Sequence, residues 1–195
     1  HLAYAYDPIG NRKTETLSDS GDTTLDYEPN ALNQYTDIYD DDQNPTYQVE
    51  PEHDPDGNLT SDGNYTYTWN DAGRLTSVTK ANDTRVEYRY DYLGRRVYRK
   101  VLTWSGSQWG NPSEHKYVYH GMQCIEELDG INNIVKTYAW GLDVAGRLDM
   151  ADSPFVSMAG AGGVGGLLAV TYSGNVFYYA YDGNGNVMEL RHSSG

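Results

Sequence analysis

Hydrophobic and polar residues alternate in short stretches along this chain, and the clearest is YTYTW at residues 65–69. Because successive side chains of a β-strand point to opposite faces, Tyr65, Tyr67 and Trp69 share one face and the two threonines share the other. Aromatic residues and threonine both suit a pleated, half-buried surface. In the following NDAG, an Asx side chain and a glycine favour a turn. Residues 65–75 are therefore predicted to form a strand, a four-residue loop and the start of a returning strand.

This pattern recurs as YAYDPIGNR, HDPDGNL, YRYDYLGRR and YAYDGNGNV, with His53 in a position that tyrosine holds elsewhere. A weaker copy, DYEPNALNQY, keeps Tyr27 and places Glu28 at the Asp position. The Asp-type positions 7, 28, 54, 70 and 91 are 21, 26, 16 and 21 residues apart, a spacing typical of stacked repeats. The repeat-defining residues are Tyr4, Tyr6, Asp7, Gly10, Asp54, Gly57, Tyr67, Trp69, Asn70, Gly73, Arg74, Tyr88, Tyr90, Asp91, Gly94, Arg95, Tyr179, Tyr181, Asp182 and Gly185.

The predicted fold is all-β, with antiparallel hairpins arranged in a curved ribbon and almost no helix. Residues 1–140 are expected to form the hairpin array. Residues 141–166 carry no repeat pattern and are expected to form an irregular, glycine-rich loop. Residues 167–195 are expected to add a further hairpin. Open strand edges in such a ribbon predict self-association or poor solubility.

Composition adds a conflict to this picture. Leu, Ile, Val and Phe make up only 34 of 195 residues and the net charge is −14, values typical of disorder. Nineteen tyrosines against two phenylalanines indicate an ordered chain instead, because each tyrosine buries a ring while its hydroxyl seeks water or a partner. The acidic balance disfavours binding to nucleic acid or anionic membrane, and no apolar run is long enough to span a bilayer.

These repeats resemble the YD repeats of the Rhs family, which includes bacterial polymorphic toxins, the shells of insecticidal toxin complexes and, more distantly, the teneurins. The resemblance implies a hollow shell of β-hairpins that encloses a C-terminal toxin, on a secreted or cell-surface bacterial protein. The implied partners are the rest of the shell and the effector, and the segment itself is expected to perform no catalysis. The family's terminal motif does not follow Gly185, so toxin and release site are expected outside these residues, and the sequence beginning at His1 is expected to be a piece of a longer chain.

Several motifs allow a functional interpretation beside a structural one. Asp-Pro-x-Gly occurs at 7–10 and 54–57 and marks self-cleavage in Rhs proteins, but here a repeat turn is favoured. GAGGVG at 160–165 has dinucleotide-site spacing without room for the helix that such a site needs. The acidic turns at 52–58 and 182–186 could bind calcium, and solvated turns are favoured there and at Asp40–Asp42. No metal and no cofactor is predicted.

Catalytic groups are scattered. The five histidines form no metal or catalytic motif, and Cys124, the single cysteine, is expected to be a buried, inert thiol in a strand. Four arginines follow a glycine directly or after one residue: Arg12, Arg74, Arg95 and Arg147. Arg74, Arg95 and Arg147 enter a strand next to aromatic rows, and these three are expected to stack on tyrosine rings or pair with turn carboxylates. The alternative function is a surface module that binds carbohydrate or protein through exposed aromatic rows.

Overall fold

A computed structural model describes residues 1–18, 22–40, 47–146 and 163–194 of the chain. Within these ranges the structure consists of strands and turns with no helix, so the all-β, antiparallel prediction is confirmed. It follows that the described residues include no helix able to span a membrane.

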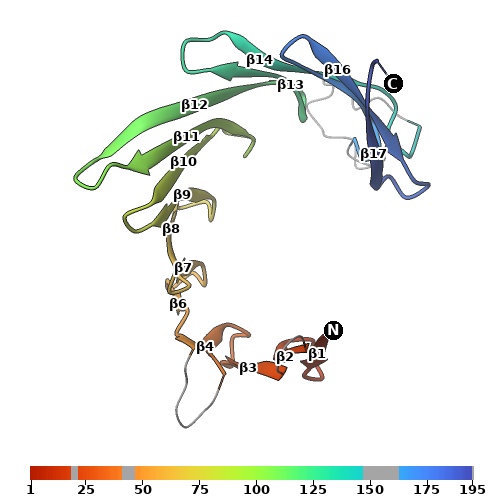
Figure 1. Cartoon of the computed structure of the whole chain (residues 1–195). Coiled ribbons are helices and arrows are strands. Elements are labelled where there is room, and N and C mark those ends of the chain that lie inside the picture. The colour runs from red at the N-terminus through yellow and green to blue at the C-terminus, as the bar shows by residue number, and fades with distance from the viewer. Residues whose placement is uncertain (19–21, 41–46, 147–162, 195) are drawn as a thin grey trace. The chain divides into compact units, whose positions relative to one another are not determined.

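The strands form two antiparallel sheets in which nearly every strand pairs with the next one in the chain (Figure 1). The first sheet has the order β1-β2-β3-β4-β5 and the second runs from β6 to β17 without a crossover. The strands are β1 Leu2–Tyr6, β2 Arg12–Ser18, β3 Asp22–Pro29, β4 Tyr35–Tyr39, β5 Gln48–Val49, β6 Glu52–His53, β7 Leu59–Ser61, β8 Tyr65–Trp69, β9 Leu75–Lys80, β10 Thr84–Tyr90, β11 Arg96–Trp104, β12 Trp109–His120, β13 Gln123–Asp129, β14 Ile134–Trp140, β15 Leu167–Tyr172, β16 Asn175–Tyr181 and β17 Val187–His192.

The chain divides into two compact units. The first unit is 1–86 with 103–109, and the second is 87–102 with 110–195. In the stretch expected to be a glycine-rich loop, β14 ends at Trp140 and β15 begins at Leu167. Residues 147–162 of that stretch, with Arg147 and Gly160–Gly162, lie outside the described residues, as do Asp41 and Asp42.

About half of the connections between successive strands turn through one recurring arrangement, which we call the Asx turn. An Asp or Asn side-chain oxygen accepts the backbone N–H groups of the second residue after it and, where described, the fourth, at 2.8 to 3.1 Å. The N–H of the third residue donates to the carbonyl of the Asx residue. The arrangement occurs at 7–11, 30–34, 54–58, 70–74, 91–95, 129–133, 143–146 and 182–186.

The third residue after the Asx always has positive φ, which accounts for the glycines of the repeat. Glycine adopts it at six turns, and Asn33 and Asn132 adopt it at the other two, with φ of 61° and 70°. A type I turn followed by such a residue closes a three-residue hairpin loop with a bulge, and register shifts lie beside the turns, as between Thr68 and Trp69. After Trp69, the predicted turn residues Asn70–Gly73 are closed by the bond from Gly73 N–H to Asn70 O. Arg74 N–H and C=O also bond back to Asn70, and β9 begins at Leu75.

Three turns were missed or misplaced by the sequence analysis. Glu28 does not occupy an Asx position; it lies in β3, and Asn30 holds the turn two residues later. Asp129 and Asp143 also form Asx turns, the second of them within 141–166, where the sequence carries no Tyr-Asp repeat. None of the three Asx residues directly follows an aromatic residue or His53-type substitute, and Asn30 and Asp129 also lack a glycine three residues later.

Hydrogen bonds lower the pKa of five turn aspartates. At Asp54, Asp129 and Asp182 the largest cause is the side-chain amide of the asparagine four residues later. At Asp7 and Asp91 partial desolvation raises the pKa, and bonds from Asn11 and Arg95 together with backbone N–H groups outweigh it. A carboxylate that accepts several N–H bonds is stabilised in its charged form, so these turns are tightest when ionised.

A first prediction isolates the positive φ at the turns. Gly73 has φ of 65°, and a Cβ there would meet only Asn58 Oδ1 at 3.9 Å, so Gly73→Ala tests backbone strain without a clash. It should lower the free energy of unfolding by about 1–2 kcal/mol, and Gly73→Asn should cost less because asparagine tolerates this conformation. The matched control is Gly183→Ala, at a turn glycine without positive φ and with open space around its Cβ position. Urea unfolding in which Gly73→Ala and Gly183→Ala have equal effects would contradict the assignment.

A second prediction follows from the lowered aspartate pKa values. Because these groups have lower pKa values folded than unfolded, their stabilisation is present above the unfolded value of about 4 and is lost as pH falls through the folded values. The urea midpoint should therefore stay nearly constant from about pH 7 to pH 5 and fall below about pH 4. The double variant Asp54→Asn with Asp182→Asn keeps the Oδ1 acceptors of the backbone N–H groups and removes the titrating carboxylates together with the bonds from Asn58 and Asn186 to Oδ2. It should be less stable than the parent at neutral pH and should lose less stability on acidification. An unchanged pH dependence in that variant would show that other groups cause the acid sensitivity.

Candidate functional site

The repeat-defining tyrosines and turn residues lie together at the hairpin ends. Residues two apart share a strand face, and the ring pairs Tyr4–Tyr6, Tyr65–Tyr67 and Tyr179–Tyr181 have centroids 6.3 to 6.5 Å apart. In β10, Tyr88 and Tyr90 stand in the same relation, followed by the Asp91 turn with Gly94 and Arg95. Each copy therefore places a row of rings beside a turn.

Neighbouring turns of the first unit contact one another. Asn11 Nδ2 donates to Asn33 Oδ1 at 3.2 Å, which joins the first two turns. A Cβ on Gly57 would lie 3.2 Å from Gln34 Nε2, and Gly73 lies similarly near Asn58. The turns at 7–11, 30–34, 54–58 and 70–74 thus lie in a row, so each hairpin's end is placed by its neighbour.

The polar ends of aromatic rings bond the backbone of the preceding hairpin at one fixed position. Tyr35 Oη accepts from Arg12 N at 2.7 Å. Trp69 Nε1 donates to Leu59 O at 2.7 Å, and Tyr119 Oη donates to Arg96 O at 3.0 Å. Arg12, Leu59 and Arg96 are each the fifth residue after an Asx, next to the bulge where the ladder of backbone bonds is interrupted. The polar atom of the ring therefore makes a hydrogen bond with a backbone group that has no ladder partner because of the bulge.

Two more rings in the second unit act in the same way. Trp140 Nε1 donates to Cys124 O at 2.7 Å, and Tyr181 Oη donates to Leu167 O at 2.6 Å. Phenylalanine could bury the ring but could not make any of these bonds. The excess of tyrosine over phenylalanine signalled such bonds, while nothing in the sequence named the acceptors.

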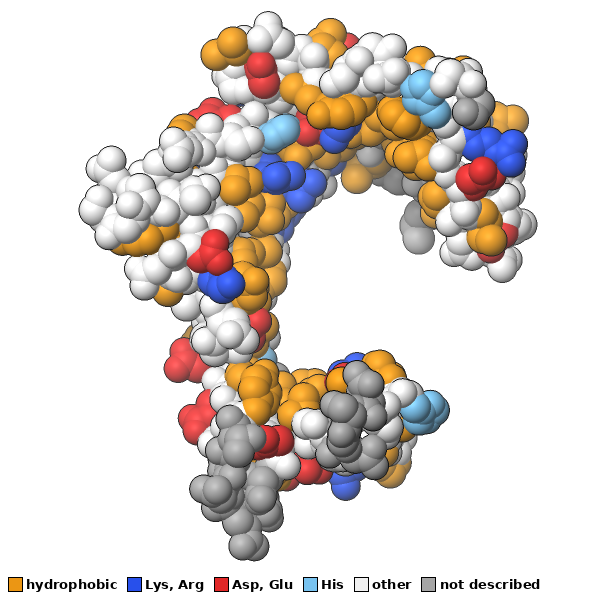
Figure 2. All heavy atoms as spheres, in the orientation of Figure 1, with side chains coloured by type: hydrophobic (Ala, Val, Ile, Leu, Met, Phe, Trp, Pro, Cys, Tyr) orange, Lys and Arg blue, Asp and Glu red, His pale blue; other side chains and the backbone are white. Residues whose placement is uncertain are grey.

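Arg12 and Arg95, which lie near two turns, combine stacking with ion pairing, and for Arg95 this is the predicted arrangement. Arg12 lies over the rings of Tyr4 and Tyr27, at 4.6 and 5.3 Å, and pairs with Glu15 at 2.7 Å. Arg95 pairs with Asp91 at 2.6 Å and lies 5.1 Å from the Tyr119 ring centroid. It also donates to Gly121 O. Figure 2 shows basic side chains lying among hydrophobic ones in this way.

One buried carboxylate, which the sequence analysis missed, joins three strands of the second unit. Glu127 is 5% exposed and lies 2.5 Å from His115 Nδ1, 3.0 Å from Lys136 Nζ and 3.2 Å from Tyr138 Oη. Burial alone raises the pKa of Glu127, but Lys136 outweighs it and the pKa is lowered. Burial and the Glu127 charge raise the pKa of Tyr138. Glu126 and Glu127 are adjacent and identical in type, and they differ only in pointing to opposite faces of the strand. The sequence therefore offers no sign that Glu127 is the buried one.

These four groups converge as catalytic groups do, yet their arrangement is that of a cross-strand clamp. Glu127 Oε2 accepts from Lys136 and Tyr138 of β14, and Oε1 lies beside His115 of β12, so the buried charge ties those strands to β13. Across the described part of the chain, no group of three or more His, Cys, Asp or Glu side chains is placed to hold a metal ion.

The turns proposed as calcium sites direct their oxygens toward the chain itself. Asp54 Oδ1 accepts two backbone N–H groups and its Oδ2 accepts Asn58 Nδ2; Asp182 does the same with Asn186. Cys124 is half-buried in β13, and burial raises the pKa of its thiol, so it is a weak nucleophile. Of the predicted glycine loop 160–165, only 163–165 are described, and Gly163 and Gly165 have positive φ.

Comparison with curated proteins finds relatives that are far longer than this chain. It is 31% identical over 197 residues to the tRNA3(Ser)-specific nuclease WapA of Bacillus spizizenii, a match covering 100% of this chain and 7% of that protein. It is 34% identical over 145 residues to the tRNA nuclease WapA of Bacillus subtilis, covering 72% of this chain and 6% of that protein.

A solved structure and a family model agree on the architecture. The TcdB2-TccC3 crystal structure superposes with a TM-score of 0.51 at 15% identity, over 97% of this chain and 11% of that one, a likeness that shows the fold alone. The family model described as the teneurin YD-shell matches residues 1–109, more than half of the chain. As the tyrosine-aspartate repeats predicted, the chain belongs to the YD-shell family.

Proposed function

We propose that this chain forms part of the wall of a YD-type shell that encloses a C-terminal effector, and that it performs no catalysis of its own. The partners are the rest of the same shell and the effector. A secreted or cell-surface place on a bacterium follows from this role, since an enclosed effector acts outside the cell that makes it.

The observation that carries the proposal is the near absence of a core. Among the described residues no side chain is less than 2% exposed, and the only apolar residues below 9% are Val49, Ala169 and Val170. A sheet with two wet faces offers few places in which to desolvate a reacting group, but it makes a thin wall. The Asx turns and ring-to-backbone bonds hold such a wall together without a core.

The relatives support an effector elsewhere in the parent protein. The two WapA proteins are named as tRNA nucleases, and this chain spans 7% and 6% of their lengths. Within the described residues, the group around Glu127 is the arrangement that most resembles a catalytic site. Glu127 is already paired there with Lys136 and lies against His115, both of this chain. These facts favour a structural role for the matched segment.

A surface module that binds carbohydrate or protein is the second candidate. It is favoured by exposed rings at the edge of the first sheet, where Tyr4 and Tyr6 are 43% and 56% exposed. Such rings stack on sugars and anchor protein partners.

Limited proteolysis of the full parent protein tests the enclosure. A C-terminal epitope should be degraded at least tenfold more slowly in the parent than in the same C-terminal segment expressed alone, because the wall excludes the protease. The matched control places the epitope directly after Gly195 of the 195-residue chain, where it should be cleaved quickly. Equally fast cleavage in all three proteins would overturn the enclosure and favour the surface module.

A further inference from the structure

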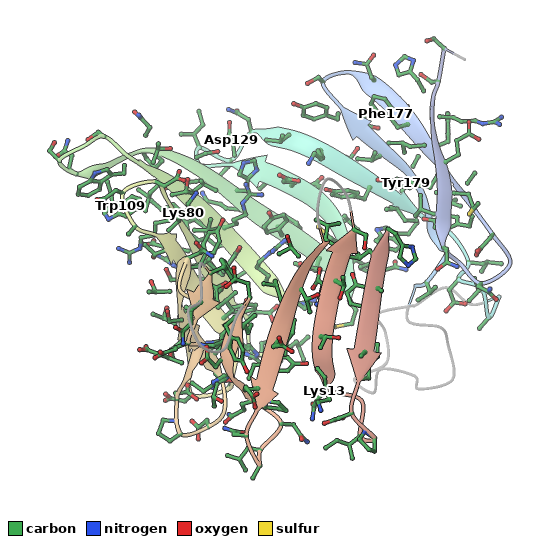
Figure 3. The ribbon with its side chains drawn as sticks, turned by 60° about the horizontal axis from the view of Figure 1, so that its bottom comes forward. Lys13, Lys80, Trp109, Asp129, Phe177 and Tyr179 are labelled. Atoms are coloured by element: carbon green, nitrogen blue, oxygen red, sulfur yellow. The ribbon has the colours of Figure 1, made fainter. Side chains whose placement is uncertain are left out.

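Four strands of the second unit place aromatic and aliphatic side chains on one face of the sheet. Tyr138 lies opposite Val170, which lies opposite Phe177. Tyr179 lies opposite Leu190. Figure 3 labels Phe177 and Tyr179, both from β16. Since facing residues in an antiparallel ladder share a face, β14 to β17 present one continuous surface here.

This surface is hollowed into a cavity of about 220 Å³ that opens to solvent. Its lining adds Lys136 and Tyr172 to the five residues named above, so four of seven lining side chains are aromatic rings. The volume is below the range of about 300–1,000 Å³ typical of small-molecule sites, and it suits a single side chain better than a whole ligand.

The cavity carries no charge that is free to bind an ion. Lys136, its one charged lining residue, is paired with Glu127 at 3.0 Å, and its ammonium lies 5.7 Å from the Tyr172 ring centroid. Tyr138 Oη also bonds Glu127, at 3.2 Å. The chain's net charge of −14 further opposes an anionic ligand. The electrostatics of the cavity therefore favour an uncharged ligand group.

Sugars and apolar side chains make different demands on such a cavity. A sugar needs several directional hydrogen-bond partners beside the ring on which it stacks. Of the polar groups that line the cavity, Lys136 and Tyr138 are already engaged by Glu127, which leaves the hydroxyls of Tyr172 and Tyr179 for a ligand. An apolar side chain needs only rings and methyl groups, which Val170, Phe177 and Leu190 supply.

We propose that this cavity receives one uncharged, apolar side chain, of leucine to tryptophan size, from a polypeptide held against the sheet. The source of that polypeptide rests on the function proposed above, in which the effector segment is the chain enclosed by the wall. The inference adds a specific contact: the wall holds its cargo through side-chain pockets on the β14–β17 face.

The test uses the 195-residue chain with N-acetyl-L-tryptophanamide and N-acetyl-L-leucinamide as probes. Nuclear magnetic resonance of the Val170 and Leu190 methyl groups should show saturable shifts with a dissociation constant on the order of 1–10 mM, as expected for so small a ligand. N-acetyl-L-aspartamide and methyl β-D-glucopyranoside should cause no saturable shift at these methyl groups.

Tyr179→Ala should weaken binding of the tryptophan probe at least fivefold. Tyr178→Ala is the matched control, because Tyr178 is the adjacent residue of β16, is 52% exposed and points to the opposite face. Leu190→Gln, at a half-exposed residue of the edge strand β17, is a second variant with little effect on packing and should weaken binding at least threefold.

Three results would overturn the inference: no saturable shift with either apolar probe, equal losses in Tyr179→Ala and Tyr178→Ala, or binding of the glucoside at the same methyl groups. The last would identify a sugar site instead. These outcomes are separable from the proposed function. Loss of protease protection in the parent would overturn enclosure and leave probe binding intact, whereas protection without probe binding would overturn only the pocket.

Discussion

A sheet one layer thick has no interior in which to hide unpaired backbone groups, and the rest of this structure depends on how those groups are satisfied. The Asx oxygen accepts two N–H groups inside each turn, and the positive-φ residue closes the loop with a third backbone bond. The same loop interrupts the ladder beside the turn. The backbone groups within each Asx turn thus have hydrogen-bond partners inside the turn. One backbone group beside the bulge is left without a ladder partner, and a ring of the next hairpin bonds it.

That backbone group without a ladder partner explains the aromatic composition. Tyr35, Trp69 and Tyr119 place a hydroxyl or an indole N–H on the backbone of the preceding hairpin, while their rings cover the adjoining surface. Where the partner is a carboxylate, the tyrosine also becomes harder to ionise: burial, followed by the hydrogen bond to Asp62, raises the pKa of Tyr67 to about 12. One residue type therefore supplies area and hydrogen bonding together, which suits a wall that is wet on both faces.

Much of this architecture could be predicted from the sequence because its signals are local. Alternation of rings with polar residues predicts the strands, and Asx followed three residues later by glycine predicts the turns. The errors occur at turns in which another residue type performs the role that the repeat pattern assigns to glycine or to the ring before the turn. Asparagine replaces glycine at Asn33 and Asn132, and the turns at Asn30, Asp129 and Asp143, which follow a proline or a leucine instead of a ring, were not predicted.

The Glu127 clamp and the cavity on the β14–β17 face could not be predicted in this way. Both depend on which strands lie side by side and in which register, as in the pairing of Glu127 with Lys136 and of Tyr138 with Val170. A single sequence of acidic and aromatic residues allows many such registers. The Glu126 and Glu127 side chains become different only when β13 is placed between its neighbours.

The central claim is that hydrogen bonds from ring ends to the neighbouring backbone, in addition to ring burial, hold successive hairpins together. The most direct measurement is the free energy of unfolding of Tyr181→Phe, which keeps the ring and deletes the bond to Leu167 O, beside Tyr178→Phe on the exposed face of the same strand. The account predicts a loss of about 1 kcal/mol for Tyr181→Phe and a change within about 0.5 kcal/mol for Tyr178→Phe. Wild-type stability in Tyr181→Phe would contradict it and would show that the rings stabilise the sheet by burial alone.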